Sequence, residues 1–358
     1  SEGALFEIFN PSTGKRLATG SNASQKIIDK TIINSIQAFD EWNSFSLAKK
    51  ASILFEYKEL LEKNIEKLAR IISKDLGKVH DDAVGEIRRG IENVEYACGI
   101  GEILKGEFNK NVSSSIDSWS EFSPLGVVLG ITPFNFPAMV PLWMFPLAIA
   151  AGNSFILKPS EKDPLASMFI VELFNKTKAP KGLLNLLNGG KEVVNELIDD
   201  ERIKAVSFVG STPVAKEIYE RSAINGKRCQ ALGGAKNHAL VLPDANIEYA
   251  TDQLISAAFG SSGQRCMALS VAVVSKEIKE KFNKSLKSKV SKLKFGNENL
   301  NQNNFGPLVS KEHLENVKNN INLAKNEGSE ILLDGRASIK RKNSSNGYFI
   351  GPTLIDKV

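Results

Sequence analysis

The sequence of 358 residues has little of what marks several large classes of protein. It contains only three cysteines, Cys98, Cys229 and Cys266. They are too few for a disulfide framework and indicate a reducing compartment, the cytoplasm or, in a eukaryote, the mitochondrial matrix. No apolar run approaches the roughly 20 residues that a bilayer-spanning helix needs, because prolines interrupt the longest one, 136–151. The sequence therefore excludes a disulfide-stabilised secreted scaffold, and we expect no membrane association.

The excess of charge of one sign is also small. The chain has 46 basic and 41 acidic residues, a formal net charge of +5, so we expect no nucleic-acid partner. The lysine-rich segment 276–294 repeats apolar residues every three or four positions, which predicts a helix with one buried face; an anionic partner for its lysines is the alternative. His80, His238 and His313 lie far apart in the sequence and show no metal-ligand spacing with cysteines or acids, so we expect no metal.

Helical periodicity dominates the first third of the chain. Apolar residues keep helical spacing over 28–39 and again over 47–72, and Gly77 lies where a helix C-cap is expected. The segment 111–123 is polar and serine-rich, which indicates an exposed strand or an excursion from the domain. From Gly126 onward, short apolar runs alternate with helical stretches, and this order predicts an α/β fold with a parallel sheet covered by helices on both faces. The runs are 127–132, 154–158, 183–187, 205–210 and 238–242, and the helical stretches are 163–177, 191–199 and 213–223.

The usual dinucleotide fingerprint G-x-G-x-x-G is absent, since Gly99 and Gly101 are followed by Leu104 at the sixth position. Two other segments follow apolar strand runs, where ligands bind in such sheets. One is Lys158-Pro159-Ser160-Glu161, whose lysine and carboxylate could both hydrogen-bond ribose hydroxyls. The other is 208–213, which runs from a strand into a helix.

In this second segment Gly210 allows close approach, and Pro213 suits a first helical turn. The amide groups at the start of that helix could bind a phosphate. Each segment alone also fits a turn or a helix cap. Their presence in one predicted sheet favours cofactor contacts.

Cys266 stands apart from the other two cysteines. It follows the glycine-containing run 260–263, which predicts a permissive loop, and the neighbouring cation Arg265 would favour a thiolate. The alternative is a buried, inert cysteine, the usual state of a free thiol. Cys98 and Cys229 lack comparable surroundings.

Four motifs together resemble the aldehyde dehydrogenase superfamily, in order and in rough spacing. They are Pro133-Phe134-Asn135-Phe136-Pro137, Lys158-Pro159-Ser160-Glu161, Phe208-Val209-Gly210-Ser211-Thr212 and Gly263-Gln264-Arg265-Cys266. The resemblance covers essentially the whole chain. It implies a Rossmann-type parallel-sheet cofactor domain, an α/β catalytic domain and a protruding oligomerisation strand.

The resemblance also implies roles for individual residues. Cys266 would attack the aldehyde and carry a thioester after hydride transfer, while Asn135 and the Cys266 backbone amide would hold the developing oxyanion. The carboxylate of Glu161 favours NAD over NADP, since it would repel a 2′-phosphate. The implied cofactor contacts are Thr132, Pro133, Phe134, Lys158, Ser160, Glu161, Phe208, Gly210 and Ser211.

One departure from the superfamily pattern bears on the reaction. Hydrolytic members carry a glutamate as general base where this chain has Ala231. Without that base water is a poor nucleophile, whereas a thiol needs less help, so the alanine favours acyl transfer to coenzyme A. The motifs 144–146, 234–238 and 265–268 resemble the CoA-acylating methylmalonate-semialdehyde dehydrogenase branch. That branch converts methylmalonate or malonate semialdehyde into propionyl-CoA or acetyl-CoA, with loss of the carboxylate.

A substrate with a carboxylate needs a cationic clamp. Arg265 adjoins the nucleophile, and Arg89, which matches the family position better than Arg88, is the second candidate. The alternative is that Arg88 and Arg89 are surface ion-pair residues.

Two other functions are alternatives to a CoA-acylating semialdehyde dehydrogenase. They are a hydrolytic aldehyde dehydrogenase and an inactive nucleotide-binding fragment.

The resemblance implies domain boundaries and an assembly. The expected NAD-binding domain spans 1–105 and 125–232, the oligomerisation strand 106–124, and the catalytic domain 233–358. Family members form homodimers or homotetramers and continue past Leu354 into a motif whose glutamate contacts the nicotinamide ribose. We therefore expect this chain to be the larger part of a longer one. Which semialdehyde is preferred, and which oligomer forms, stay open.

Overall fold

The computed structural model describes residues 3–297, 299–337 and 346–358. The chain forms two compact units. The first unit comprises Ser1–Phe6, Thr19–Leu68 and Gly85–Gly233, and the second comprises Glu7–Ala18, Ala69–Val84 and Gly234–Val358. In the described part of the chain, no helix combines the length and the apolar composition that crossing a membrane requires.

The sheet of the first unit has five parallel strands in the order β7-β6-β5-β8-β9, so that β5 is central. Every residue of β5 and β6 is buried, as continuous apolar runs predict for the inner strands of a covered parallel sheet. The α/β prediction is therefore confirmed. The strands are β5 (Val127–Ile131), β6 (Ser154–Lys158), β7 (Leu184–Leu186), β8 (Ile203–Val209) and β9 (Arg228–Leu232).

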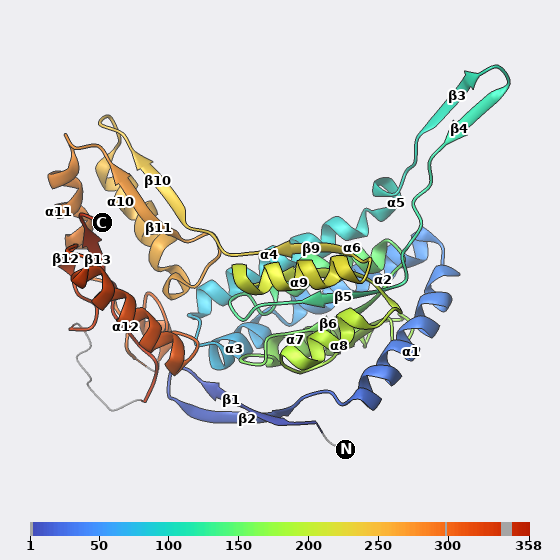
Figure 1. Cartoon of the computed structure of the whole chain (residues 1–358), viewed down its shortest axis with the longest axis horizontal. Coiled ribbons are helices and arrows are strands. Elements are labelled where there is room, and N and C mark those ends of the chain that lie inside the picture. The colour runs from blue at the N-terminus through green and yellow to red at the C-terminus, as the bar shows by residue number, and fades with distance from the viewer. Residues whose placement is uncertain (1–2, 298, 338–345) are drawn as a thin grey trace. The chain divides into compact units, whose positions relative to one another are not determined.

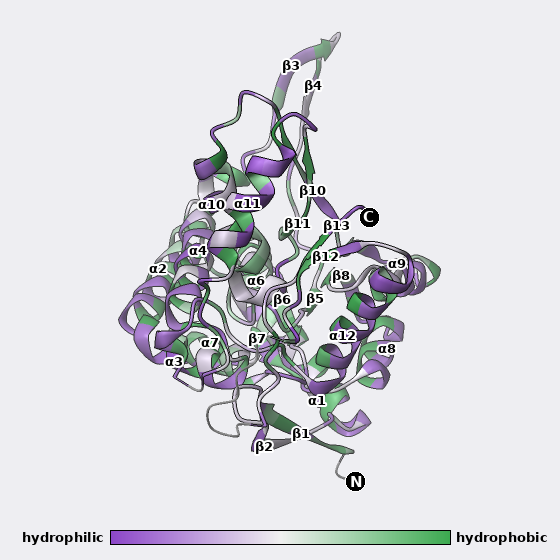
Figure 2. Cartoon of the chain, turned by 90° about the vertical axis from the view of Figure 1, so that its left-hand side faces the viewer, coloured by the Kyte–Doolittle hydropathy of each residue, from purple (hydrophilic) through white to green (hydrophobic). Residues whose placement is uncertain are grey.

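Helices cover both faces of this sheet. On one face, apolar residues of three helices pack against Leu129 and Val206 in a single core cluster; these helices are α1 (Gln25–Asn43), α8 (Lys191–Asp199) and α9 (Thr212–Ile224). On the other face Phe155 contacts the ring of Phe145, which in turn contacts Tyr57 and Phe174. These rings come from β6 and from α2 (Leu47–Lys63), α6 (Met139–Ala150) and α7 (Leu165–Phe174). Figure 2 shows hydrophobic and hydrophilic residues together on α8 and α9, which fits helices with one buried face.

Most predicted elements are confirmed, with ends that differ by up to three residues, and one is wrong. The helices expected at 163–177, 191–199 and 213–223 are α7, α8 and α9. The periodic segment 47–72 is not one helix: α2 ends before Asn64, and α3 (Ile65–Asp75) begins directly after it. The apolar residues keep their helical spacing across this break because each of the two helices buries an apolar face. Gly77 has a φ of 78° and donates its amide to Ser73, which confirms the predicted C-cap.

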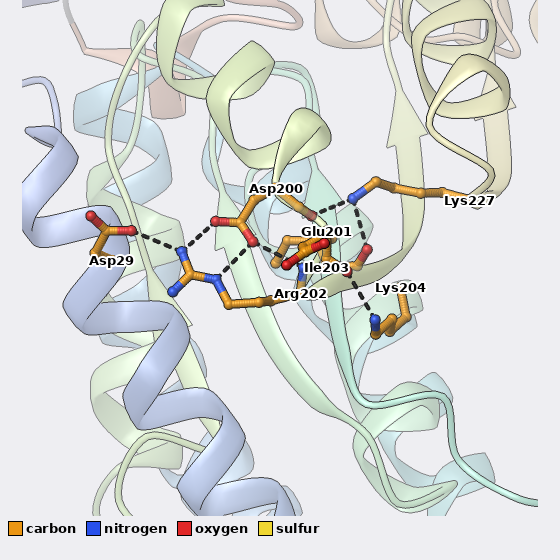
Figure 3. Close-up of polar contacts among 7 residues, drawn as sticks. All are labelled: Asp29, Asp200, Glu201, Arg202, Ile203, Lys204 and Lys227. Carbon is orange, nitrogen blue, oxygen red and sulfur yellow. Dashed lines mark hydrogen bonds and ion pairs between the residues drawn. The ribbon is translucent and has the colours of Figure 1, made fainter.

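A polar network ties the start of β8 to α1 and to the start of β9 (Figure 3). The guanidinium of Arg202 donates to Asp200 and, at 2.8 Å, to Asp29 of α1. The ammonium of Lys227 donates to the carbonyl oxygens of Asp200 and, at 2.8 Å, Ile203. Hydrogen bonding from Arg202 holds the pKa of Asp200 below its usual value. This network lies at the amino ends of the strands, the end opposite to the expected cofactor residues.

An exposed hairpin interrupts the first unit between α5 (Ile100–Ile103) and β5. Its antiparallel strands β3 (Phe108–Ser113) and β4 (Ile116–Trp119) are exposed at every residue, which confirms the predicted excursion (Figure 1). Phe108 and Trp119 face each other across the strands and are 63% and 71% exposed. Large apolar side chains in such a position are typical of an interaction surface.

The second unit is built around a parallel strand pair. β10 (Asn237–Val241) runs beside β11 (Leu269–Val274), and between them the chain forms α10 (Ile247–Phe259) and the 3-10 turn η1 (Gly260–Gly263). Phe282 and Val290 are buried on α11 (Lys279–Val290), which confirms the helix predicted within 276–294. The remaining elements are β1 (Leu5–Asn10) and β2 (Lys15–Ser21), shared between the units, α4 (His80–Cys98), α11 (Lys279–Val290), η2 (Leu300–Gln302), α12 (Lys311–Asn326), β12 (Glu330–Leu333) and β13 (Leu354–Asp356).

Candidate active site

The turn that carries Asn135 connects β5 to α6 and is held from two sides. The carboxylate of Glu86, fully buried on α4, accepts hydrogen bonds from the backbone amides of Ala138 and Met139 at 3.0 and 3.2 Å. A carboxylate at this place also interacts favourably with the positive end of the α6 dipole. From α7, the Ser167 hydroxyl donates to the carbonyl oxygen of Pro137 at 2.7 Å. The backbone around Asn135 is therefore fixed by buried hydrogen bonds.

Arg89 reaches the same turn. It lies one helical turn after Glu86 on α4, and its guanidinium carbon is 5.8 Å from the ring centroid of Phe136. Phe136 is buried and directly follows Asn135. Arg89 therefore lies beside the turn that carries Asn135, within the first unit.

Lys158 and Glu161 meet at the carboxyl end of β6. Lys158 is 5% exposed, donates to the carbonyl oxygen of Gly189 at 3.1 Å, and lies 3.4 Å from a carboxylate oxygen of Glu161. Burial lowers the pKa of Lys158, and the nearby carboxylate acts in the opposite direction. Ser160 accepts a hydrogen bond from the backbone amide of Lys162 and shapes the turn between them. The Glu161 side chain stays 45% exposed, so its carboxylate is open to a ligand.

The segment after β8 presents backbone more than side chains. Phe208 is 4% exposed within the core, so a cofactor contact there would come from its backbone. A Cβ added to Gly210 would lie 2.4 Å from the Phe208 ring, which explains why only glycine fits. Ser211 is the N-cap of α9 but its side chain makes no capping hydrogen bond, and Pro213 occupies the first turn as predicted.

These segments share one edge of the sheet. β6 and β8 lie on the two sides of β5, so the chain leaves the central strand in one direction and later returns on the other. Ligands bind outside the carboxyl ends of the strands at such a switch point. The turn containing Thr132, Pro133 and Phe134 follows β5 at this edge, and the Lys162 ammonium lies 5.8 Å from the Phe134 ring centroid.

Cys266 lies on a strained loop of the second unit. Ser261, Ser262 and Gly263 have φ angles of 50°, 58° and 73° in succession, a left-handed stretch that costs energy for the two serines. Neighbouring segments hold this conformation. The Gln264 side chain accepts from the Val309 amide at 3.0 Å and donates to the carbonyl oxygen of Pro307 at 3.3 Å.

Asn237 fixes the loop on the other side of the cysteine. Its side-chain amide donates to the carbonyl oxygens of Cys266 and Ala268 at 2.9 and 3.0 Å. The sequence indicates Asn237 only as one residue of the 234–238 motif and does not predict these two hydrogen bonds. The available signal was its place at the start of β10, which pairs with the strand that follows the nucleophile.

The other two cysteines have different surroundings. Cys98 is buried, and burial raises the pKa of its thiol to about 11. Burial also raises the pKa of Cys229. Cys266, partly exposed, is the one that follows the strained turn.

Arg265, the neighbour of Cys266, is paired with Asp82. The sequence does not indicate Asp82, because 183 positions separate the two residues. Across the described ranges, no group of histidine, cysteine and acidic residues is arranged to hold a metal ion.

A parallel sheet with candidate ligand-binding segments at its switch point, and a partly exposed cysteine on a constrained loop, are typical of an α/β enzyme that combines a cofactor site with a cysteine nucleophile. The chain belongs to the aldehyde dehydrogenase family, which it matches over residues 1–358. The resemblance predicted from the motifs is therefore confirmed, together with its fold.

Two relatives are similar to this chain over almost its whole length. The chain is 47% identical over 357 residues to a malonate-semialdehyde dehydrogenase of Pseudomonas aeruginosa, and 45% identical over 350 residues to malonate-semialdehyde dehydrogenase 2 of Geobacillus thermodenitrificans. These alignments cover 99% and 98% of this chain and 72% of each relative.

Solved structures agree with these relatives. The methylmalonate-semialdehyde dehydrogenase of Oceanimonas doudoroffii superposes with a TM-score of 0.97 at 50% identity, covering 99% of this chain and 73% of that one. A protein of Sinorhizobium meliloti described as a methylmalonate-semialdehyde dehydrogenase and solved in complex with NAD gives a TM-score of 0.97 at 40% identity, covering 99% and 72%.

Proposed function

We propose that this protein oxidises malonate or methylmalonate semialdehyde with NAD and transfers the acyl group from Cys266 to coenzyme A. The observation that carries the proposal is a family cysteine on a constrained loop combined with alanine at position 231. The names of the relatives, malonate- and methylmalonate-semialdehyde dehydrogenase, support the substrate class.

The residues at the switch point fit NAD. Lys158 and the exposed carboxylate of Glu161 suit the two hydroxyls of the adenosine ribose, and a relative has been solved with NAD. Glycine at position 210, followed by the N-cap Ser211 that makes no side-chain capping hydrogen bond, gives the start of α9 a backbone that suits a phosphate. When bound, NAD would supply a hydride acceptor. We assign this role to the first unit and the catalytic cysteine to the second.

The chemistry of the chain's own residues follows from their types. The Cys266 thiolate adds to the aldehyde carbon, and the oxyanion that forms is stabilised by the Asn135 amide and the Cys266 backbone N–H. After oxidation, the acyl group remains on the sulfur as a thioester. Ala231, partly buried against the core of the first unit, offers no base for water. The coenzyme A thiolate therefore attacks the thioester carbonyl, and the Cys266 thiolate leaves.

The substrate carboxylate would be recognised by arginines. Arg265 precedes the nucleophile, and Arg89 lies over the ring next to Asn135. Paired N–H donors of arginine match a carboxylate well. Loss of this carboxylate as carbon dioxide leaves an enolate that the thioester stabilises and that takes a proton from solvent.

The test of this function is NADH formation by the protein with malonate semialdehyde, with and without coenzyme A. We expect a single burst without coenzyme A and sustained formation with it. Sustained formation without coenzyme A would support the hydrolytic alternative, and no NADH under either condition would support the inactive fragment. In the same assay, Arg265→Ala should raise KM for malonate semialdehyde far more than for propanal, and an equal effect on both would refute the clamp.

The assembly is a further part of the proposal. We propose that 106–124 forms an oligomerisation element and that the protein is a homodimer or homotetramer. The exposed, facing rings of Phe108 and Trp119 on this hairpin support it.

A further inference from the structure

Gly260 provides the space that the Arg265 side chain occupies. A Cβ added to Gly260 would lie 2.6 Å from the guanidinium carbon of Arg265 and 2.7 Å from each of its terminal nitrogens. The backbone of Gly260, with φ −54° and ψ 135°, is one that any residue adopts. A side chain at position 260 would therefore have to displace the guanidinium, whereas the turn itself makes no demand for glycine.

A single carboxylate joins this guanidinium to the strained turn. One oxygen of Asp82 accepts from Nη2 of Arg265 at 2.9 Å. Its other oxygen accepts from the backbone amide and the hydroxyl of Ser261 at 3.0 and 3.2 Å. The Arg265 and Asp82 side chains are only 25% and 24% exposed, so solvent screens this pair less than it screens a surface ion pair.

The pairing leaves part of the guanidinium available. Nε of Arg265 lies 3.4 Å from the Ser261 hydroxyl, and Nη2 is engaged by Asp82. Within the ranges that the structure describes, Nη1 has no hydrogen-bond partner. Since arginine carries five N–H donors, an edge of the group remains for a second carboxylate.

We propose that Asp82 and Gly260 are positioning residues that hold Arg265 folded against its own loop, and that this orientation sets the preference for aldehydes bearing a carboxylate. The inference rests on the role proposed above for Arg265. A fixed guanidinium loses little freedom when it binds a carboxylate, whereas a mobile arginine must be ordered first. Asp82 does not touch the substrate; it acts through Arg265.

Alkylation of Cys266 tests the proposal without turnover, NAD or coenzyme A. Iodoacetate carries a carboxylate and iodoacetamide is its neutral analogue; in both reactions the thiolate displaces iodide and forms a carbon–sulfur bond. The readout is the ratio of the two rate constants at Cys266, followed by mass spectrometry of its peptide. Using the ratio removes changes in thiol reactivity that affect both reagents equally.

Two variants disturb Arg265 in independent ways. Gly260→Ala displaces the guanidinium by its methyl group, and Asp82→Asn removes the charge that holds Nη2. We expect each to lower the iodoacetate-to-iodoacetamide ratio by roughly tenfold, the effect of about one charge-assisted hydrogen bond. Arg265→Ala sets the lower limit, and Asp82→Glu, which keeps the charge, should recover part of the ratio. Gly101→Ala is the matched control, because a methyl group there meets nothing within 4 Å.

The outcomes distinguish the positioning role of Asp82 and Gly260 from the role of Arg265 itself in binding a carboxylate. If Arg265→Ala lowers the ratio but Gly260→Ala and Asp82→Asn do not, the positioning proposal is overturned and the clamp stands. If Arg265→Ala leaves the ratio unchanged, the clamp itself is wrong. If Asp82→Asn slows both reagents equally, Asp82 supports the loop only, and the positioning proposal is again overturned.

Discussion

Replacing Asn237 with alanine removes both hydrogen bonds that its side chain donates to the nucleophile loop, at 2.9 and 3.0 Å. Each neutral hydrogen bond is worth about 1 kcal/mol, so the loop should lose about 2 kcal/mol of local stability. Because 1.4 kcal/mol corresponds to tenfold, the open population of the loop should rise by roughly 30-fold. Asn237→Asp should cost more, since a carboxylate would face the two carbonyl oxygens.

Amide hydrogen exchange measures this effect directly. Peptides covering 260–268 should exchange faster in Asn237→Ala, while peptides from β5 and β6 should not change. Asn225→Ala is the matched control, because its side chain also donates two hydrogen bonds, to Asp199 and to the Arg221 carbonyl at the end of α9. Exchange at 260–268 within about threefold of the wild-type rate would refute the reasoning, as would an equal increase in Asn225→Ala.

Two further predictions concern stability and assembly. Hydrogen bonding from Arg202 lowers the pKa of Asp200 in the folded state, so its stabilisation is present above the unfolded value of roughly 4 and is lost as the pH falls. Asp200→Asn should therefore be about 1–2 kcal/mol less stable in urea unfolding at neutral pH, and a deficit that does not shrink as the pH is lowered from neutral into the acid range would contradict this assignment. For the assembly, Phe108→Glu combined with Trp119→Glu should lower the sedimentation mass of the protein, and an unchanged mass would refute the role proposed for the hairpin.

Sequence reasoning succeeds where the signal is local. The runs that became β5 and β6 are continuous and apolar, because both faces of those strands are covered. Gly77 and Pro213 were recognisable because a left-handed C-cap and a first helical turn restrict the residue at one position. The break at Asn64 escaped detection, since a small change of backbone direction leaves the apolar spacing of the two helices intact.

The same distinction between local and non-local signals applies to the residues of the candidate site. Cys266, Asn135 and Lys158 could be named as candidates because each belongs to a short motif with a distinctive composition. Asp82 could not, because nothing near it in the sequence indicates a partner 183 residues away. The contact of Gly260 with the Arg265 guanidinium was equally hidden: it depends on where a side chain five positions later folds back, which no local pattern encodes.

The left-handed turn before Cys266 has a consequence for folding. Its two serines are held in an unfavourable conformation by partners that come from distant parts of the second unit, Asp82 for one and Gly306 for the other. The local sequence does not favour this turn, so it exists only after those segments have come together. The thiol thus acquires its surroundings only when these distant segments are packed together, and its reactivity reports whether the second unit is fully assembled.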